Sequence, residues 1–227
     1  MKKVAAFLPC RKGSQRIKNK NIRTFAGIDG GLVKIKLLQL SKVNSIEKIY
    51  LSTNDEEVIE ITKKLNIDNL IIDIRPEYLC ASETTTDELI KYVPNLIQNE
   101  HILWTHVTSP FIDDLVYENA IMQYYSLLRK SENDSLMSVT ELKKFIWDKK
   151  GPVNYNRDNR KWPFTQSINP LFEVNSGIFI SSRNNYLKLS DRIGETPFYF
   201  ILDNIKSFDI DWQEDFQIAE LLFKKCL

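Results

Sequence analysis

Cysteine, net charge and long apolar runs are all scarce in this sequence. The three cysteines, Cys10, Cys80 and Cys226, are an odd number, lie far apart and lack metal-type spacing. We therefore expect reduced thiols and a cytoplasmic protein rather than a disulfide framework. No segment is apolar over the length that spans a bilayer, and the apolar run at residues 4–8 is too short for a signal peptide, so we expect no membrane partner.

The composition is that of an ordinary soluble globular protein. Lys and Arg number 31 against 30 Asp and Glu, which leaves a net charge of +1. This balance argues against a dedicated nucleic-acid or membrane-surface binder. With 227 residues, of which 43% are hydrophobic and 27% charged, the chain fits one α/β domain with a sizeable core.

One segment departs from this balance. Residues 11–23 carry six Lys or Arg side chains and no acid, and they follow an apolar run that predicts a buried first strand. Gly13, Ser14 and Asn21 lie in the same segment, so backbone N–H groups, a hydroxyl and ammonium groups are available to hold a polyanion. The segment has neither the closing Gly-Lys-Ser/Thr of a Walker A loop nor the glycine spacing of a dinucleotide fingerprint.

The place of this basic loop in the chain favours a ligand site over the alternative, a solvated loop that touches nothing. The first strand-to-helix loop of an α/β sheet lies at the carboxyl ends of the strands, where such folds bind ligands. We therefore expect the loop to bind an anion.

Hydrophobic periodicity predicts alternating strands and helices. Strands are expected at residues 4–8, 48–53, 70–74 and 101–107, with helices at 34–43, 55–65, 87–97 and 113–128. The short loops between them predict right-handed βαβ units, hence an α/β fold with a mostly parallel sheet flanked by helices. Past residue 133, strands are expected at 136–142, 172–181, 199–202 and 207–210, and a closing helix at 212–223.

The segment 145–166 interrupts this rhythm, because it is irregular, aromatic and contains Pro. A long stretch of this kind is typical of a functional segment or an interface. We therefore expect a single domain, residues 1–227, with an inserted subdomain around 135–170. The aromatic side chains gathered there, Trp147, Tyr155, Trp162 and Phe164, are typical of an interface.

Two aspartates near the carboxyl end form the second candidate site. Asp209 and Asp211 are two residues apart in a predicted strand, so both carboxylates are expected on one face. Such a pair repels unless a cation or basic group lies between, and Mg²⁺ takes one or two carboxylates together with phosphate oxygens. The alternative is a solvated edge strand in which Asp211 caps the following helix.

The order of residues in the basic loop is more specific than its charge. The run Arg-x-Gly-Ser-x-Arg-Ile-x-x-Lys-Asn-Ile resembles the opening motif of the acylneuraminate cytidylyltransferases, the CMP-sialic acid synthetase family, and also its pseudaminic acid branch. The Asp-x-Asp at 209–211 and the run at 75–85 are similar to later motifs of that family. The resemblance covers essentially the whole chain in order, loosely over 145–171.

This resemblance implies a Rossmann-like sheet of the nucleotide-diphospho-sugar transferase type and a Mg²⁺-dependent nucleotidyltransferase that forms a homodimer. It implies that Arg11, Lys20 and Asp211 act in catalysis and that Asp209 and Asp211 hold Mg²⁺. The nucleotide-binding residues that it implies are Pro9, Cys10, Arg11, Gly13, Ser14, Arg16, Lys20, Asn21, Arg75 and Ser82.

The resemblance also implies residues on the sugar side. His106 stands where most members have a Gln that faces the sugar, and it would act as a hydrogen-bond partner or as a base, unless it is structural. Asn175 matches a family Asn, with a polar residue satisfied inside the sheet as the alternative. The family Arg that binds the sugar carboxylate is replaced by Phe164, so Arg160 is expected to substitute, because a carboxylate prefers a bidentate guanidinium.

The activity that the resemblance implies is transfer of CMP from CTP to the anomeric hydroxyl of a sialic-acid-like sugar acid, with release of pyrophosphate, for cell-surface polysaccharide biosynthesis. One rival is a metal-dependent glycosyltransferase that uses a nucleotide sugar, although its Asp-x-Asp usually lies mid-chain. The other is a polyanion- or RNA-binding module, which the absence of an aromatic stacking platform in the basic loop disfavours, so we expect no nucleic-acid partner.

Overall fold

The apolar runs of the first half of the chain form four parallel strands, as predicted. The computed structural model describes residues 3–226. Its strands in this half are β1 (Val4–Pro9), β2 (Ile46–Thr53), β3 (Leu70–Ile74) and β4 (His101–Trp104), in the spatial order β3-β2-β1-β4. The helices between them are α1 (Gly31–Ser41), α2 (Glu56–Lys63), α3 (Thr86–Leu96) and α4 (Asp114–Lys130), with a short 3₁₀ turn η1 (Glu77–Leu79).

The second half of the chain completes a seven-stranded sheet. Strand β8 (Leu171–Ser182) runs antiparallel between β4 and β5 (Ser135–Leu142), and β9 (Pro197–Ile201) pairs parallel with β5 at the edge. Helix α5 (Arg183–Leu189) follows β8, and α6 (Gln213–Cys226) ends the chain. The mostly parallel α/β fold is confirmed. The strand predicted at 207–210 is wrong, because that segment is irregular, and α5 is not predicted.

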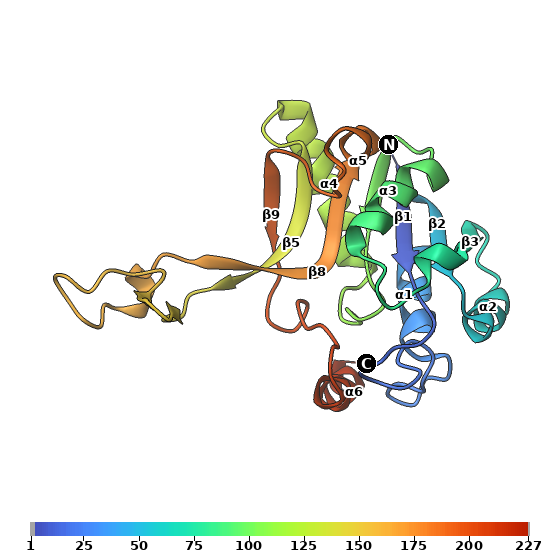
Figure 1. The fold of residues 1–227 in the computed structure, drawn as a ribbon, viewed down its shortest axis with the longest axis horizontal. Helices are drawn as coiled ribbons and strands as arrows, with labels where there is room; N and C mark the ends of the chain where they lie inside the picture. Colours follow the sequence, from blue (N-terminus) through green and yellow to red (C-terminus); the bar gives the residue numbers. More distant parts are fainter. Residues whose placement is uncertain (1–2, 227) are drawn as a thin grey trace.

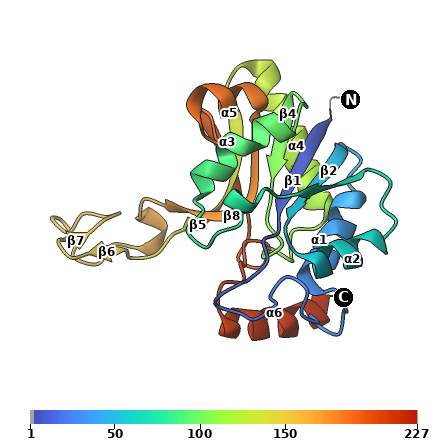
Figure 2. The same cartoon turned by 45° about the vertical axis from the view of Figure 1, so that its right-hand side comes forward.

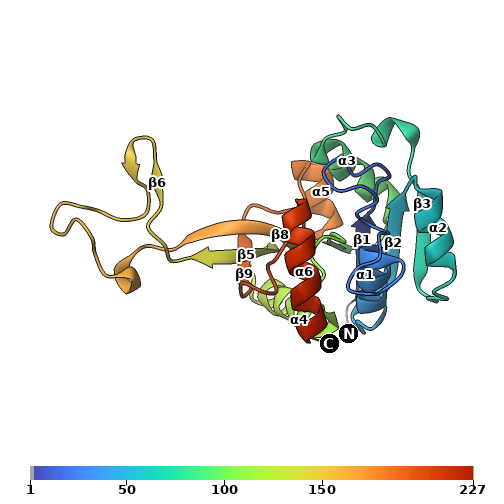
Figure 3. The ribbon, with the colours of Figure 1, turned by 90° about the horizontal axis from the view of Figure 1, so that it is seen from below.

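Helices cover both faces of the sheet (Figure 3), with α3 and α5 on one side and α1, α4 and α6 on the other. Alternate side chains of β1 enter different cores. Phe7 packs among residues of α3, α5 and β8, whereas Leu8 packs among residues of α1, α4 and α6. A strand that is buried on both faces has a continuous run of apolar residues. This is why β1 can be predicted from the sequence.

A two-stranded arm projects from the sheet (Figure 1). Strands β5 and β8 continue past their neighbours and lead to a small hairpin made of β6 (Trp147–Asp148) and β7 (Gly151–Pro152), with a 3₁₀ turn η2 (Thr165–Ser167). The arm occupies the range in which the sequence predicts an inserted subdomain. Figure 2 shows that it extends away from the helices of the body.

The described thiols and helices bear on two expectations from composition. Cys10 and Cys80 are free thiols, whereas the side chain of Cys226 lies outside the described residues. Among residues 3–226, no helix is both long enough and apolar enough to cross a membrane.

Helix α1 begins at Gly31, three residues before the predicted start, because its first turn packs against the basic loop. A Cβ on Gly31 would lie 2.1 Å from the carbonyl oxygen of Arg23, and φ is +52° at this residue, so only glycine fits. The Val33 N–H donates to the carbonyl of Asn21 at 2.9 Å. The basic loop is therefore fixed directly to the helix that follows it.

A buried lysine ties α1 to the loop that follows β4. Nζ of Lys36 donates to the carbonyl oxygens of Ser109 and Ile112 at 2.8 and 3.1 Å, and to Oη of Tyr117 at 2.9 Å. The Tyr117 hydroxyl is also hydrogen-bonded to Thr105 Oγ1, which donates to the backbone of β8. Burial lowers the pKa of Lys36, yet three acceptors match the three N–H groups of an ammonium.

Replacing Lys36 is expected to destabilise the protein. In Lys36→Met three buried acceptors lose their donor, and each unsatisfied group costs about 1–3 kcal/mol, so the free energy of unfolding should fall by about 3 kcal/mol or more. Urea denaturation followed by circular dichroism measures the loss. The control is Lys34→Met on the same helix, where the side chain is partly exposed and a change within about 0.5 kcal/mol is expected. Equal losses in the two variants would contradict this role.

Candidate functional site

A polar cavity of about 260 Å³ opens at the carboxyl ends of β1 and β4. Its walls come from the basic loop and from the loop after β4, and its lining residues are Pro9, Cys10, Arg11, Ser14, Gln15, Arg16, Lys20, Asn21, His106, Val107 and Thr108. Seven of the ten predicted nucleotide-binding residues are therefore brought together, with His106 beside them. A second cavity shares Pro9, Arg11 and His106 and adds the predicted Arg75.

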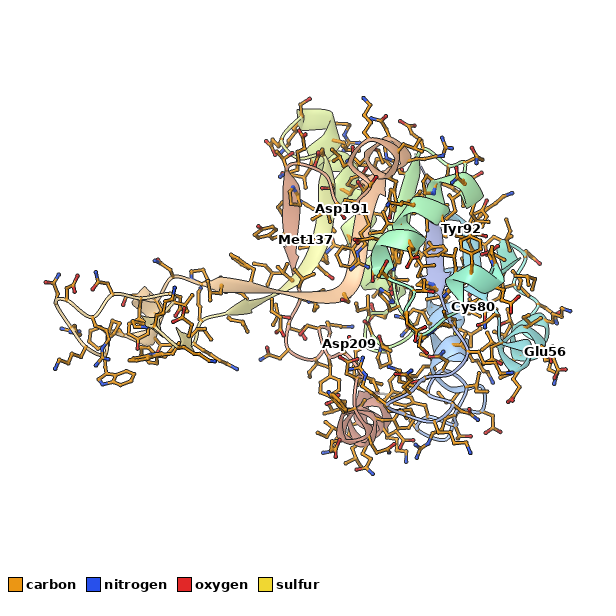
Figure 4. All side chains as sticks on the ribbon, viewed as in Figure 1. Glu56, Cys80, Tyr92, Met137, Asp191 and Asp209 are labelled. Carbon is orange, nitrogen blue, oxygen red and sulfur yellow. The ribbon has the colours of Figure 1, made fainter. Side chains whose placement is uncertain are left out.

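The two ends of the chain meet at this cleft. Nζ of Lys20 donates to the carbonyl of Ile210 at 2.9 Å, and Nη1 of Arg16 lies 3.0 Å from Oδ1 of Asp211. Burial lowers the pKa of Lys20, and the charges of Asp211 and Asp209 oppose that shift. Figure 4 shows Asp209 on the connection that leads from β9 to α6, above α6 in this view.

Helix α6 supports the basic loop from the other side (Figure 2). The ring of Phe25 packs edge-on against Phe216 and Phe223, with centroids 5.2 and 5.4 Å apart. Arg23 donates to Oε1 of Gln213 at 3.0 Å and lies over the Phe216 ring. The aromatic packing fixes the loop that carries Lys20 above the C-terminal helix.

The two aspartates lie in an irregular segment rather than on one face of a strand. The Ile210 N–H donates to the carbonyl of Thr108 at 3.0 Å, so the residue between them is held by the loop after β4. Asp211 does not cap α6. Oδ2 of Asp215 accepts from the N–H groups of Asp211 and Trp212 at 3.1 and 2.7 Å, which leaves the Asp211 carboxylate to the cleft.

The pair has the donor chemistry of a divalent cation site. Oδ1 of Asp209 is buried and has no hydrogen-bond partner among the described residues. Burial raises the pKa of Asp209, and Asp211 adds to that shift, whereas Thr108 and Lys20 oppose it. Within residues 3–226 no group of three or more His, Cys, Asp or Glu could hold a metal. Two carboxylates supply the oxygen ligands that Mg²⁺ takes together with phosphate oxygens.

The loop after η1 closes over the basic loop. Nη1 of Arg11 donates to the carbonyl of Ala81 at 2.6 Å, and Gln15 donates to Oγ of the predicted Ser82 at 3.0 Å. Nδ2 of Asn21 donates to the Arg11 carbonyl at 3.1 Å, which shapes the loop from within. Gly13, where φ is +80°, gives the loop its left-handed turn.

Cys10 lines the first cavity and Arg75 lines the second. Nε and Nη2 of Arg75 donate to Oγ and to the carbonyl of Ser52 at 3.1 and 2.8 Å, so the guanidinium is held beneath the second cavity. Burial raises the pKa of Cys10 to about 12, which keeps the thiol protonated and unreactive.

His106 is a hydrogen-bond donor in this arrangement. The indole N–H of Trp104 donates to Nε2 of His106 at 3.0 Å, and because an indole only donates, the proton of a neutral imidazole is on Nδ1. Burial lowers the pKa of His106 to about 3, with the charges of Arg192 and Lys20 adding to the shift. A neutral ring with Nε2 occupied has no free lone pair, so the geometry favours a hydrogen-bond partner over a base.

Two predicted sugar-side residues lie elsewhere. Asn175 is buried in β8, where its carboxamide bonds to Ser138, Thr140 and the Gly177 N–H. Arg160 lies on the arm, with Cζ 4.8 Å from the centre of the Phe164 ring. The structure therefore does not bring Arg160 to the cleft of its own chain.

The sequence matches the family model for cytidylyltransferases over residues 5–226. The chain belongs to the cytidylyltransferase family. It is 26% identical to the N-acylneuraminate cytidylyltransferase of Escherichia coli O18:K1:H7 over 98% of its length, and it spans about half, 52%, of that relative. It is 23% identical to the post-translational flagellin modification protein B of Campylobacter coli, over 99% of this chain and 97% of the relative.

A solved structure has the same fold as this cytidylyltransferase. The CMP:2-keto-3-deoxy-manno-octonic acid synthetase complexed with CTP aligns with a TM-score of 0.70 at 14% identity, over 99% of this chain and 100% of its own.

The sequence prediction misses several residues of the cytidylyltransferase cleft. Gln15 and Thr108 line the first cavity, and Asn54 accepts from the Lys12 N–H at 2.9 Å. The local signal is the basic-loop motif around Gln15 and the position of Thr108 two residues after His106. Trp104 is a core residue of β4 whose indole N–H faces the site, and an apolar run alone does not reveal that contact.

The imidazole of His106 is expected to stay neutral, with its proton on Nδ1, from about pH 8 to about pH 5, because its pKa is well below the usual value of about 6.5. Long-range ¹H–¹⁵N NMR measures the tautomer and its titration, and His106→Gln assigns the signals. Since the unfolded imidazole binds a proton that the native one lacks, the free energy of unfolding should also fall as the pH drops from about 6.5 towards about 3. Titration of His106 near pH 6.5 would contradict this environment.

Proposed function

We propose that this cytidylyltransferase transfers CMP from CTP to the anomeric hydroxyl of a sialic-acid-like sugar acid, a nonulosonic or related 2-keto-3-deoxy acid, and releases pyrophosphate. The observation that carries the proposal is the convergence of the basic loop and the aspartate pair, through Lys20 on Ile210 and Arg16 on Asp211, in one cleft. The names of the Escherichia coli relative and of the CTP-bound structure support this substrate class.

The basic loop would hold the triphosphate. Arg11, Ser14, Arg16 and Lys20 all line the cleft. Cationic side chains placed around the phosphates stabilise the negative charge that develops on pyrophosphate as the bond between the α- and β-phosphates breaks. Because Arg16 already pairs with Asp211, this side chain is held at the boundary between the phosphates and the acid pair.

Asp209 and Asp211 would hold Mg²⁺, which supplies Lewis-acid polarisation of the α-phosphate when it is bound. The chain's own contribution is to keep the two carboxylates in place. Ile210 does this between them, since its N–H donates to Thr108 and its carbonyl accepts from Lys20. Asp215 does it from α6 by holding the Asp211 N–H.

Arg75 and the loop around Ser82 would select the base. Arg75 lines the second cavity, and a guanidinium N–H can donate to O2 of cytosine. A hydroxyl or a backbone carbonyl accepts from the cytosine amino group, which uracil lacks. Ser82 lines neither cavity, but its hydroxyl accepts from Gln15, which lines the first.

Loss of a charged side chain from either the basic loop or the aspartate pair should reduce turnover without unfolding the protein. Removal of one preorganised charge contact costs about 10²–10³ in kcat, so Lys20→Ala and Asp211→Ala are each expected to lose that much or more. Pyrophosphate release from CTP, Mg²⁺ and a panel of sugar acids measures the rate. The matched control is Lys18→Ala, an exposed lysine of the same loop that does not line the cleft. Normal turnover in either cleft variant would refute the assignment.

The same assay separates the rival functions. A glycosyltransferase would consume a nucleotide sugar and would release no pyrophosphate from CTP and a sugar acid. An RNA-binding module would retain RNA at moderate salt without any CTP turnover. Removal of divalent cations by a chelator is expected to abolish turnover, because the carboxylate pair then lacks its cation.

The proposal includes a homodimer. The edge of the sheet and the arm expose Phe172, Val174, Tyr199 and Ile201, and the arm end exposes Trp162 at 61% and Phe164 at 69%. Apolar side chains gathered in this way mark an interface more often than a free surface. In such a dimer the arm would extend to the partner, and only there would Arg160 meet a sugar acid.

Phe172→Glu is expected to convert a dimer into a monomer. Phe172 lies in this exposed apolar surface, where the centre of its ring is 5.1 Å from that of the Tyr199 ring. Formation of the dimer would bury a carboxylate placed at this position without a partner, which is unfavourable. Light scattering after size-exclusion chromatography measures the mass. The control is Leu115→Glu, at a position 75% exposed on α4, which should leave the mass unchanged. A monomeric unmodified protein would contradict the dimer.

A further inference from the structure

Trp104 brings a polar group from the core to the wall of the cleft. The side chain is buried, yet its indole N–H donates to Nε2 of His106 at 3.0 Å. The path of β4 continues past Trp104, since the Thr105 N–H donates to the carbonyl of Phe7 on β1 at 3.1 Å. Residues two apart along such a path share a face of the sheet, so the course of the backbone brings Trp104 and His106 together.

The neighbours of the indole hold it in one orientation. Trp104 is the register partner of Phe7 on β1 and of Phe179 on β8. The Phe7 ring packs edge-on against the indole, with centroids 4.7 Å apart, and Cζ of Arg192 lies 5.2 Å from the centre of the indole ring. The direction of the indole N–H is therefore fixed by the core before any ligand binds.

His106 stands at the junction of the two cavities. It lines both of them, as Pro9 and Arg11 do. The preceding residue, Thr105, donates from Oγ1 to the carbonyl of Gly177 at 2.7 Å, so β8 as well as β1 holds the backbone that carries the imidazole. The imidazole is thus placed where a bound substrate can meet it.

The contact with the indole decides which hydrogen bonds His106 can make. A neutral imidazole has one N–H and one lone pair, and the lone pair of Nε2 accepts from Trp104. The group left for a ligand is the N–H of Nδ1, so the ring can donate but not accept. A glutamine, the residue that the family resemblance places at this position, could do both through its carboxamide. His106 is therefore the more selective of the two.

The charged side chains of the cleft also favour a ligand rich in acceptors. Arg11, Arg16 and Lys20 line the first cavity and Arg75 lines the second, and each of these side chains only donates. Among the described residues, no Asp or Glu lines either cavity. Hydroxyl, carbonyl and phosphate oxygens are the acceptors that such walls bind.

We propose that Trp104 is a positioning residue that makes His106 an obligate hydrogen-bond donor to a hydroxyl or carbonyl oxygen of the sugar acid. The inference rests on the proposed function. Trp104 acts through the tautomer of His106 and not on the reacting atoms. A group that can only donate, such as an ammonium, is disfavoured at this point of the cleft, because two donors would face each other.

Removal of the indole N–H tests the positioning directly. In Trp104→Phe the proton of the neutral imidazole is free to move to Nε2, so long-range ¹H–¹⁵N NMR at pH 7 should show His106 no longer purely in the Nδ1–H form. The other histidine, His101, is the internal control. It lies at the start of the same strand and bonds to Tyr124 through Nδ1, so its signals should not change.

The same variant should weaken binding of the sugar acid. In Trp104→Phe the KM for the acid is expected to rise about 2- to 10-fold, the range for the net contribution of one hydrogen bond between neutral groups, while the KM for CTP stays the same. Pyrophosphate release measures both constants. In a His106→Ala background, Trp104→Phe should leave the KM for the acid unchanged, because no imidazole is left to position.

A second replacement separates the loss of the N–H from the loss of ring size. Trp104→Phe leaves a cavity in the core and should lower the thermal midpoint. Benzothienylalanine at position 104 has a sulfur atom in place of the indole N–H and keeps the size of the ring, so the contacts with Phe7 and Arg192 remain. It should give the same changes in the tautomer and in KM, with a thermal midpoint near that of the unmodified protein.

Each outcome is decisive. An unchanged Nδ1–H tautomer of His106 in both replacements would overturn the inference. So would a changed tautomer with an unchanged KM for the acid, a rise in the KM for CTP alone, or equal losses with and without the His106 side chain. If the unmodified protein makes no CMP-sugar from any acid in the panel, the proposed function fails and the sugar contact fails with it, whereas the NMR measurement still decides whether Trp104 positions His106.

Discussion

The contact between the loop after β1 and the segment before α6 is the constraint on which the site depends. Lys20 holds the carbonyl of Ile210, and Arg16 meets Asp211 from the same loop. The ion pair is half exposed and adds at most about 1 kcal/mol to stability, so it positions groups more than it stabilises the fold. The packing of Phe25 against Phe216 and Phe223 provides the stability that keeps the two segments together.

The loop after β4 is the third part of this arrangement. Lys36 holds it from α1, and Thr108 of the same loop accepts from Ile210. Removal of this buried lysine would leave three acceptors without a donor and so would reduce the free energy of unfolding. Lys36 lines neither cavity, so it affects the site through the backbone of the loop after β4, which it holds. His106 and Trp104 occupy the end of β4 and the start of this loop, so their geometry depends on the same network.

Much of the fold could be predicted from the sequence, because a sheet buried on both faces leaves continuous apolar runs such as 4–8. The convergence of the basic loop and the aspartates at one cleft also follows from strand direction, since loops after parallel strands share one edge of the sheet. The segment 207–210 was harder. Phe208 and Ile210 alternate with acids as in a strand. Among residues 3–226, however, no strand pairs with them, and the segment is irregular.

Other features depend on distant contacts and leave little local signal. Helix α5 has seven residues, and its start depends on the Ser182 hydroxyl that accepts from the Asn185 N–H. The turn before β9 has no local signal, because Asp134, which lies far from it in sequence, accepts from the N–H groups of Glu195 and Thr196. Arg160 is expected at the sugar from its residue type and its place just before Phe164, whereas the continuation of β5 and β8 carries it out along the arm.

The position of α6 under the basic loop has a consequence for biosynthesis. The cations of the loop are translated first, and the acids that face them and the aromatic side chains that support them follow about 190 residues later. A nascent chain therefore has no assembled cleft until α6 has emerged from the ribosome and docked. Competence to bind a nucleotide then arrives in one step with the docking of α6.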